Sequence, residues 1–185
     1  GLPNDDVRDC DIDGSGGLWI STFGGGVAYF DGVWTLLNTG NSDLPYDEVF
    51  VARVHPNGHV WFGTRYGLVD YDAGEFTVYT SDNSILEDND IRHIEFGNEG
   101  EVVICTRYGG VYTIGTDASW TSYTTINSNL PSDETWESLV DDAGNLWIAT
   151  SEGLATIAGW SSNTAVAEAA AFPQAMVSLN NDRLQ

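Results

Sequence analysis

Short apolar segments alternate with glycine- and aspartate-rich turns along the chain. In the first 40 residues, such segments occupy positions 7–12, 18–22, 27–30 and 34–37. They are rich in β-branched and aromatic residues, which favours β-strands joined by tight turns. The second segment of each group is apolar at consecutive positions, as in Val60-Trp61-Phe62, so we expect it to be covered on both faces. Each group of four segments is therefore predicted to form an antiparallel meander.

This group of segments occurs four times. The repeats open at Leu2, Leu44, Leu86 and Leu130, at spacings of 42, 42 and 44 residues. A period near 40 that contains four short strands is typical of a β-propeller blade. The sequence thus predicts an all-β propeller of four blades over residues 1–163, with a C-terminal extension over residues 164–185. The predicted repeats cover residues 2–43, 44–85, 86–129 and 130–163.

Blades that stack face to face bury large apolar side chains between them and carry small residues where neighbouring sheets approach closely. We expect Trp19, Trp61 and Trp147, which recur in the second strands, to be buried between blades. Two positions after each of these, and after Val103 in the third repeat, the chain carries a small residue that would let the next blade approach. These small residues are Ser21, Gly63, Cys105 and Ala149.

The repeated phrases resemble a known family. The pattern of leucine-proline, a polar pair and a strand, followed by phrases such as Asn145-Leu-Trp-Ile-Ala-Thr150, is similar to the two-component regulator propeller repeat. The third repeat departs from it, because Val103 replaces the tryptophan and Glu87 the proline. The resemblance implies an extracytoplasmic propeller, as in the sensor half of hybrid histidine kinases or in surface and secreted proteins of Bacteroidota. Members of that family usually have more than four repeats.

The charge of the chain narrows the choice of partners. It has 28 acidic and 6 basic residues, a formal net charge of -22, and no lysine. Such a surface repels nucleic acid phosphates and anionic lipid, so we expect neither as a partner. No stretch reaches the ~18 to 20 apolar residues of a membrane span, so no membrane insertion is expected. Together with the resemblance, the composition favours an extracellular or cell-surface location.

The sequence contains few residues that are candidates for a disulfide, a metal site or catalysis. Cys10 and Cys105 are expected to be buried, unpaired thiols on opposite blades. The Asp11-Ile12-Asp13 segment resembles the start of a calcium loop but lacks the ligands that would complete one. Asp13, like Asp141, is expected to bond the backbone of its own turn. No catalytic constellation, metal site or cofactor is predicted, and the protein is not expected to be an enzyme.

The turn between the second and third strands offers a candidate binding site. In a meander, this turn and the link between blades lie on the same face. The predicted ligand-binding residues, which occupy this turn in three blades, are Phe23, Arg65, Tyr66, Arg107 and Tyr108. Arginine and aromatic rings at a propeller mouth can hold a carboxylate or stack on a sugar. The alternative is that each arginine pairs with an acidic link residue of a neighbouring blade, such as Asp47 or Asp90, and locks the ring.

The C-terminal extension contains an apolar stretch that resembles a degraded repeat opening. Its predicted assembly residues are Phe172, Pro173, Met176, Val177 and Leu179. Three interpretations remain open: packing on the outer surface of the same chain, a strand offered to another subunit, or the beginning of a fifth blade. The second predicts a homo-oligomer or a head-to-tail polymer.

Three functions from different classes are compatible with the sequence. We expect a non-enzymatic structural, self-assembly or protein-interaction module of a bacterial surface or secreted protein. The alternative is a ligand-sensing propeller that binds an oligosaccharide or a peptide. The third is a lyase or hydrolase, for which the sequence provides no catalytic residues.

Overall fold

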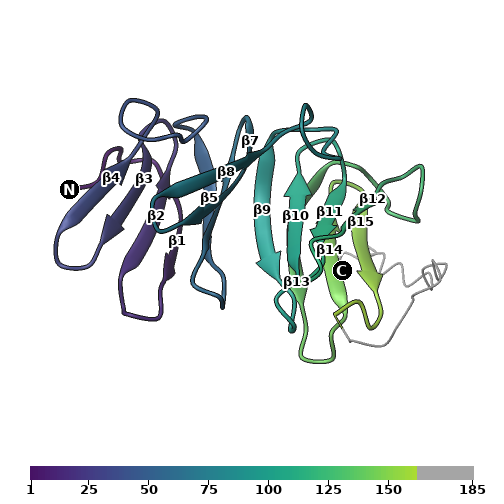
Figure 1. The fold of residues 1–185 in the computed structure, drawn as a ribbon. Coiled ribbons are helices and arrows are strands. Elements are labelled where there is room, and N and C mark those ends of the chain that lie inside the picture. Colours follow the sequence, from purple (N-terminus) through teal and green to yellow (C-terminus); the bar gives the residue numbers. More distant parts are fainter. Residues whose placement is uncertain (162–185) are drawn as a thin grey trace, which may run out of the picture.

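The computed structural model describes residues 1–161, and this part of the chain contains only strands and connections (Figure 1). Fifteen strands form four antiparallel sheets. The strands are β1 (Val7–Ile12), β2 (Leu18–Thr22), β3 (Gly26–Phe30), β4 (Trp34–Leu37), β5 (Val49–Val54), β6 (Val60–Thr64), β7 (Gly67–Asp72), β8 (Glu75–Tyr79), β9 (Ile91–Phe96), β10 (Val102–Thr106), β11 (Val111–Ile114), β12 (Trp120–Tyr123), β13 (Thr135–Val140), β14 (Leu146–Thr150) and β15 (Gly153–Ile157).

Each sheet is a meander that corresponds to one predicted repeat. Blade 1 contains β1–β4, blade 2 β5–β8 and blade 3 β9–β12. Blade 4 has three strands, β13–β15, among the described residues. The predicted all-β, bladed architecture is confirmed, and the four expected strands of the first repeat all form. No helix in the described residues could span a membrane.

The blades stack in chain order around their first strands. Strand β5 packs between β1 and β9, and β13 follows β9 (Figure 1). The described residues show no comparable packing between the strands of blades 1 and 4. The four blades therefore form an open arc. Each blade has a front face, directed toward the following blade, and a back face, directed toward the preceding one.

Three apolar clusters fill the interfaces between successive blades. Trp19 lies between blades 1 and 2, where its ring centroid is 5.8 Å from that of Phe62 and 5.4 Å from that of Tyr71. Trp61 lies between blades 2 and 3. Both indoles are buried, as predicted. The prediction for Trp147 is wrong: its side chain is only half-buried, because no described blade follows blade 4.

The predicted small residues mark a close approach between blades. A Cβ atom placed on Gly63 would lie 2.5 Å from Val51 Cγ1 and 2.8 Å from Ile91 Cγ2. Ser21 and Cys105, at the equivalent positions, are fully buried. Bulk at this position would therefore push blades 2 and 3 apart.

The two cysteines are unpaired, as predicted, but their burial differs. Cys105 is buried between blades 3 and 4, and this burial raises the pKa of its thiol to about 12. Cys10 is exposed, so the prediction that both thiols are buried is wrong. It lies on the back face of blade 1, which no described residue of another blade covers.

Two aspartates organise the hairpin turns of blades 1 and 4. Asp13 accepts hydrogen bonds from the Ser15 and Gly17 amides at 2.9 Å, and from the Tyr29 hydroxyl at 2.8 Å. Asp141 accepts them from the Asn145 amide and the Trp147 indole, both at 2.9 Å. The predicted bonds to the turn backbone are confirmed, and bonds from side chains add to them.

These turns give stability a pH dependence of defined sign. Hydrogen bonds lower the pKa of Asp13 and Asp141 from 3.8 to about 2. A carboxyl group with a lowered pKa contributes stability that is fully present above its unfolded pKa and is lost as the pH falls through the folded value. We expect this contribution to disappear between about pH 4 and pH 2. Denaturant titrations across that range measure it.

The matched variants are Asp13→Asn with Asp141→Asn, and Asp43→Asn, which removes an exposed charge in a link. The turn variant should be less stable than the wild type at pH 7 and lose less stability on acidification. An acid slope equal to that of the wild type would show that these carboxylates do not carry the effect.

Candidate binding face

The turns after the second strands meet the links between blades. The amide of Arg65 donates to the Glu48 carbonyl at 3.1 Å, and the amide of Arg107 to the Asp90 carbonyl at 2.9 Å. Blades 1 and 4 repeat this arrangement. The turns and links therefore share one end of the blades, the upper end in Figure 1, which we call the link face. This confirms the shared face expected of a meander.

Every first strand carries a β-bulge at its beginning. Strand pairing shifts between Val7 and Asp9 in β1, and the same shift recurs in β5, β9 and β13. A bulge inserts one residue and turns its side chain out of the normal alternation. The inserted residues, one from each blade, are Arg8, Phe50, Arg92 and Trp136.

Three of the inserted residues and one predicted residue form a continuous row. The Arg8 guanidinium carbon lies 4.6 Å from the centroid of the Phe23 ring, and that ring lies 5.7 Å from the Phe50 ring. The Arg92 guanidinium carbon lies 4.0 Å from the Phe50 centroid. Cations over aromatic faces are attracted by the ring quadrupole. The row joins blades 1, 2 and 3 across the link face.

The two predicted arginines are held by carboxylates. Arg65 Nη1 donates to Glu48 Oε2 at 2.8 Å, and this bond raises the pKa of Arg65 above its ordinary value. Arg107 Nη1 lies 3.7 Å from Asp90 Oδ2, and its guanidinium carbon is 4.8 Å from the Tyr108 centroid.

These pairs differ from the expected lock between neighbouring blades. Arg107 pairs with Asp90, as the alternative named, whereas Arg65 uses Glu48 instead of Asp47. Each pair joins a turn to the link that enters the same blade. The pairs therefore connect turn and link in blades 2 and 3 and leave the predicted binding role open.

The aromatic side chains beside these arginines remain accessible. Tyr66 is 52% exposed and Tyr108 59%, and the bulge residue Trp136 of blade 4 is 50% exposed. The link face thus offers flat rings next to charged guanidinium groups, a combination that can stack on a sugar ring or hold a carboxylate. Arg8 and Arg92, also on this face, pair with Asp6 and Asp90 respectively. An incoming anion would compete with these carboxylates.

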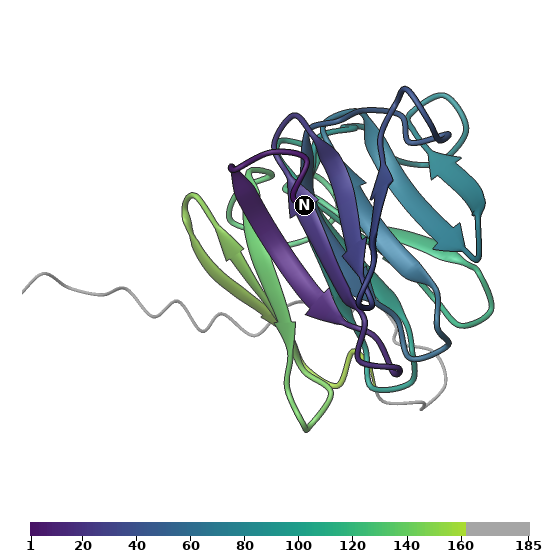
Figure 2. The same ribbon diagram turned by 90° about the vertical axis from the view of Figure 1, so that its left-hand side faces the viewer.

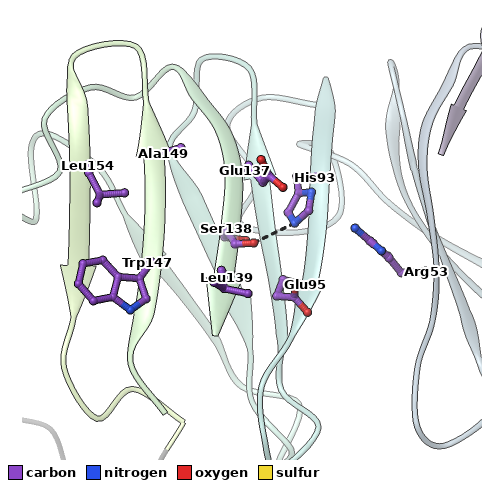
Figure 3. Close-up of a pocket in the computed structure, with 9 residues that line it drawn as sticks. All are labelled: Arg53, His93, Glu95, Glu137, Ser138, Leu139, Trp147, Ala149 and Leu154. Atoms are coloured by element: carbon purple, nitrogen blue, oxygen red, sulfur yellow. Dashed lines mark hydrogen bonds between the residues drawn. The ribbon is translucent and has the colours of Figure 1, made fainter. Parts of the chain in front are cut away.

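A second feature is a hollow of about 450 Å³ at the front face of blade 4 (Figure 3). Arg53, His93 and Glu95 border it from the first strands of blades 2 and 3. His93 Nε2 lies 3.1 Å from the Ser138 carbonyl oxygen, and burial lowers the pKa of His93. The remaining lining residues come from blade 4: Glu137, Ser138, Leu139, Trp147, Ala149 and Leu154.

The described residues contain no group of three or more His, Cys, Asp or Glu side chains positioned to hold a metal ion. His55 and His93 each face a backbone carbonyl oxygen, and His59 Nδ1 lies 2.8 Å from Asp70 Oδ1.

The bulge residues were not predicted, although the sequence carried a signal. Each directly follows the first residue of its strand, and in all four repeats it is arginine or a large aromatic residue. Strict alternation along a strand treats this position as an ordinary solvent-facing residue. Comparing equivalent positions of the repeats would have identified it.

No protein-family model and no curated protein matches the sequence. Among solved structures, the extracellular domain of a hybrid two-component system from B. thetaiotaomicron is similar, with 22% identity and a TM-score of 0.70. Virginiamycin B lyase from Staphylococcus aureus has 20% identity and a TM-score of 0.65. PorZ, a surface component of the type-IX secretion system of Porphyromonas gingivalis, has 19% identity and a TM-score of 0.66.

These alignments cover most of this chain and a smaller part of the other proteins. They include 83%, 85% and 86% of this chain respectively. They include 22% of the two-component protein, 54% of the lyase and 27% of PorZ. The chain therefore spans about half the length of the lyase and about a quarter of the other two. The likeness establishes a β-propeller fold.

Proposed function

We propose that this protein is a non-enzymatic, extracellular propeller module that self-associates or binds other proteins at a bacterial surface. The observation that most directly supports this proposal is the exposed apolar surface at both ends of the arc. Ile12 of blade 1 is 64% exposed and Leu139 of blade 4 is 58% exposed. Leu139 borders the hollow of blade 4 together with Trp147 and Leu154, and exposed apolar side chains gathered in this way mark interaction sites.

The proposed location rests on composition and on the comparisons. A chain with a net charge of -22 and no lysine is suited to a solvated exterior. Two of the similar structures are an extracellular domain and a bacterial surface component. The predicted assembly segment, from Phe172 to Leu179, lies outside the described residues, and its role stays a prediction.

Sedimentation velocity over a range of protein concentrations tests self-association. We expect the mean sedimentation coefficient to rise with concentration. It should also rise with added NaCl, because salt screens the repulsion between copies of the same strongly acidic chain. A single species of monomer mass under all these conditions would contradict the self-assembly proposal.

A second candidate function is favoured by the exposed rings of the link face. Tyr66 and Tyr108, with Arg65 and Arg107 beside them, offer rings that can stack on an oligosaccharide and guanidinium groups that can bind a peptide. The similarity to an extracellular domain of a two-component system supports a sensing role of this kind.

Calorimetric titration with a neutral oligosaccharide, cellohexaose, tests this candidate. Replacing both Tyr66 and Tyr108 with alanine should weaken binding by about tenfold or more, since each removes an aromatic stacking surface. The melting temperature should change little, because both rings are more than half exposed.

The matched control is Val33→Ala. Val33 is 72% exposed in the turn between β3 and β4, at the other end of blade 1. If the tyrosine variant and the Val33→Ala control bind the probe with equal affinity, the link face is not its binding site.

A further inference from the structure

The three interfaces inside the arc share one construction, in which the front face of one blade packs on the back face of the next. The leucine that opens a repeat is inserted there: Leu44 is 3% exposed, Leu86 2% and Leu130 4%. Leu2, the equivalent residue of blade 1, is 42% exposed. Blade 1 therefore presents a back face of the repeat type without a blade against it.

The first strand of blade 1 shows the same difference. Val7 is 44% exposed, whereas its equivalents Val49 and Ile91 are fully buried. Strand pairing places Val7, Cys10 and Ile12 on one side of β1. Figure 2 views the molecule from this end, where no other described segment covers the blade 1 sheet. The exposed part of this side, at Leu2 and β1, is thus the part that the preceding blade covers in blades 2, 3 and 4, whereas Ile20 and Ala28 farther out on the same side are buried.

Blade 4 shows the complementary condition on its front face. The residue after the glycine that opens the third strand is fully buried in blades 1, 2 and 3, as Val27, Leu68 and Val111. Its equivalent in blade 4, Leu154, is 44% exposed. Leu154 borders the hollow of about 450 Å³ together with Trp147 (Figure 3). In blades 1, 2 and 3, the following blade occupies the space that the hollow occupies in blade 4.

One polar contact at the interface between blades 1 and 2 also has counterparts at the ends of the arc. Between blades 1 and 2, the carboxylate of Asp9 accepts a hydrogen bond from the Ala52 amide at 3.3 Å. The residue equivalent to Asp9 in blade 4 is Glu137, and the residue equivalent to Ala52 in blade 1 is Cys10. Stacking the back face of a blade 1 on the front face of a blade 4 would bring a carboxylate to the corresponding backbone amide.

We propose that a second copy of this chain covers the front face of blade 4 with the back face of its own blade 1. This inference rests on the proposed self-association and specifies its contact. The argument for a second copy is continuity with the internal interfaces: each end face has the construction of a face that receives a blade inside the arc. Among the described residues, the matching face for each end lies at the opposite end of the arc, so a second copy can supply it. Because the two faces differ, the contact is heterologous and either closes into a ring or continues as a chain.

Complementary variants test this contact. Ile12→Asp introduces a charge on the back face of blade 1, and Leu154→Asp introduces one on the front face of blade 4. Both side chains are exposed in a single copy, so each variant should fold, and circular dichroism checks this. Each variant alone should lose association by more than about tenfold, since a charge would be buried in an apolar contact.

Mixing the two variants gives the decisive result. The Ile12→Asp copy retains an intact front face, and the Leu154→Asp copy retains an intact back face. Their equimolar mixture should form a dimer with one copy of each, measured by sedimentation velocity. The matched control Ile126→Asp, at a position 93% exposed in the link between blades 3 and 4, should associate like the wild type.

The outcomes separate the contact from the proposed function. Wild-type association that neither face variant weakens would overturn the front-to-back contact and leave self-association standing. Absence of association in the wild type would overturn both. Deletion of residues 171–185 should leave association intact. If that deletion abolishes association, the tail is the connector and the front-to-back contact is wrong.

Discussion

Replacing Trp61 with alanine is expected to lower the free energy of unfolding by about 3 to 5 kcal/mol, the usual cost of truncating a buried tryptophan. Trp61 is 6% exposed and belongs to the apolar cluster between blades 2 and 3. Its ring stacks on Tyr79 at a centroid distance of 6.2 Å and an interplanar angle of 8°. Truncation leaves a cavity that the neighbouring sheets are too stiff to fill. Urea denaturation followed by far-ultraviolet circular dichroism measures the loss.

Trp147→Ala is the matched control, because Trp147 holds the same place in its repeat. Its side chain is half-buried, and its indole donates to Asp141 Oδ2 at 2.9 Å. In a single copy, the variant should lose clearly less stability than Trp61→Ala. Equal losses at a concentration where the protein is monomeric would mean that the front face of blade 4 is covered, contrary to the open arc.

The second large effect is expected at Gly63. Gly63→Ala should lower the free energy of unfolding by about 1 to 3 kcal/mol, the typical cost of overpacking a well-packed core. The added methyl group would meet side chains of Val51 and Ile91, and would lie 3.0 Å from the Ile91 carbonyl oxygen. Because a backbone atom is among the contacts, relief requires the two blades to separate.

Ala149→Val provides the comparison for this substitution. Ala149 lies at the equivalent position of blade 4, where it borders the hollow. The larger side chain should leave the stability of a single copy nearly unchanged and weaken association. A loss at Gly63 no greater than that at Ala149 would contradict close packing as the reason for glycine between blades 2 and 3.

The repeat explains why the fold could be predicted in such detail. Local turn chemistry and strand composition fixed the strands of each blade, and the four copies of the pattern supported one another. Stacking followed because Trp19 and Trp61 recur in strands that are apolar on both faces. The local pattern is the same in every blade and therefore does not distinguish an internal blade from a terminal one.

That distinction accounts for the two errors in burial. Trp147 and Cys10 occupy positions that are buried inside the arc, and both lie on terminal faces. Their exposure depends on what stands beside a blade, which is a property of the whole stack. The candidate site stays a prediction, but the face that carries Arg65, Tyr66, Arg107 and Tyr108 could be predicted because these residues recur at equivalent turns. Their carboxylate partners depend on how the links fold against the turns.

The central claim is that the arc is open and that its end faces receive another copy. Hydrogen-deuterium exchange measured at low and high protein concentration tests it most directly. We predict that exchange in β1, β14 and β15 slows at high concentration, while exchange in β6 and β10, already enclosed between blades, stays the same. If the end strands exchange equally fast under conditions where the protein is associated, the contact lies elsewhere and the claim is contradicted.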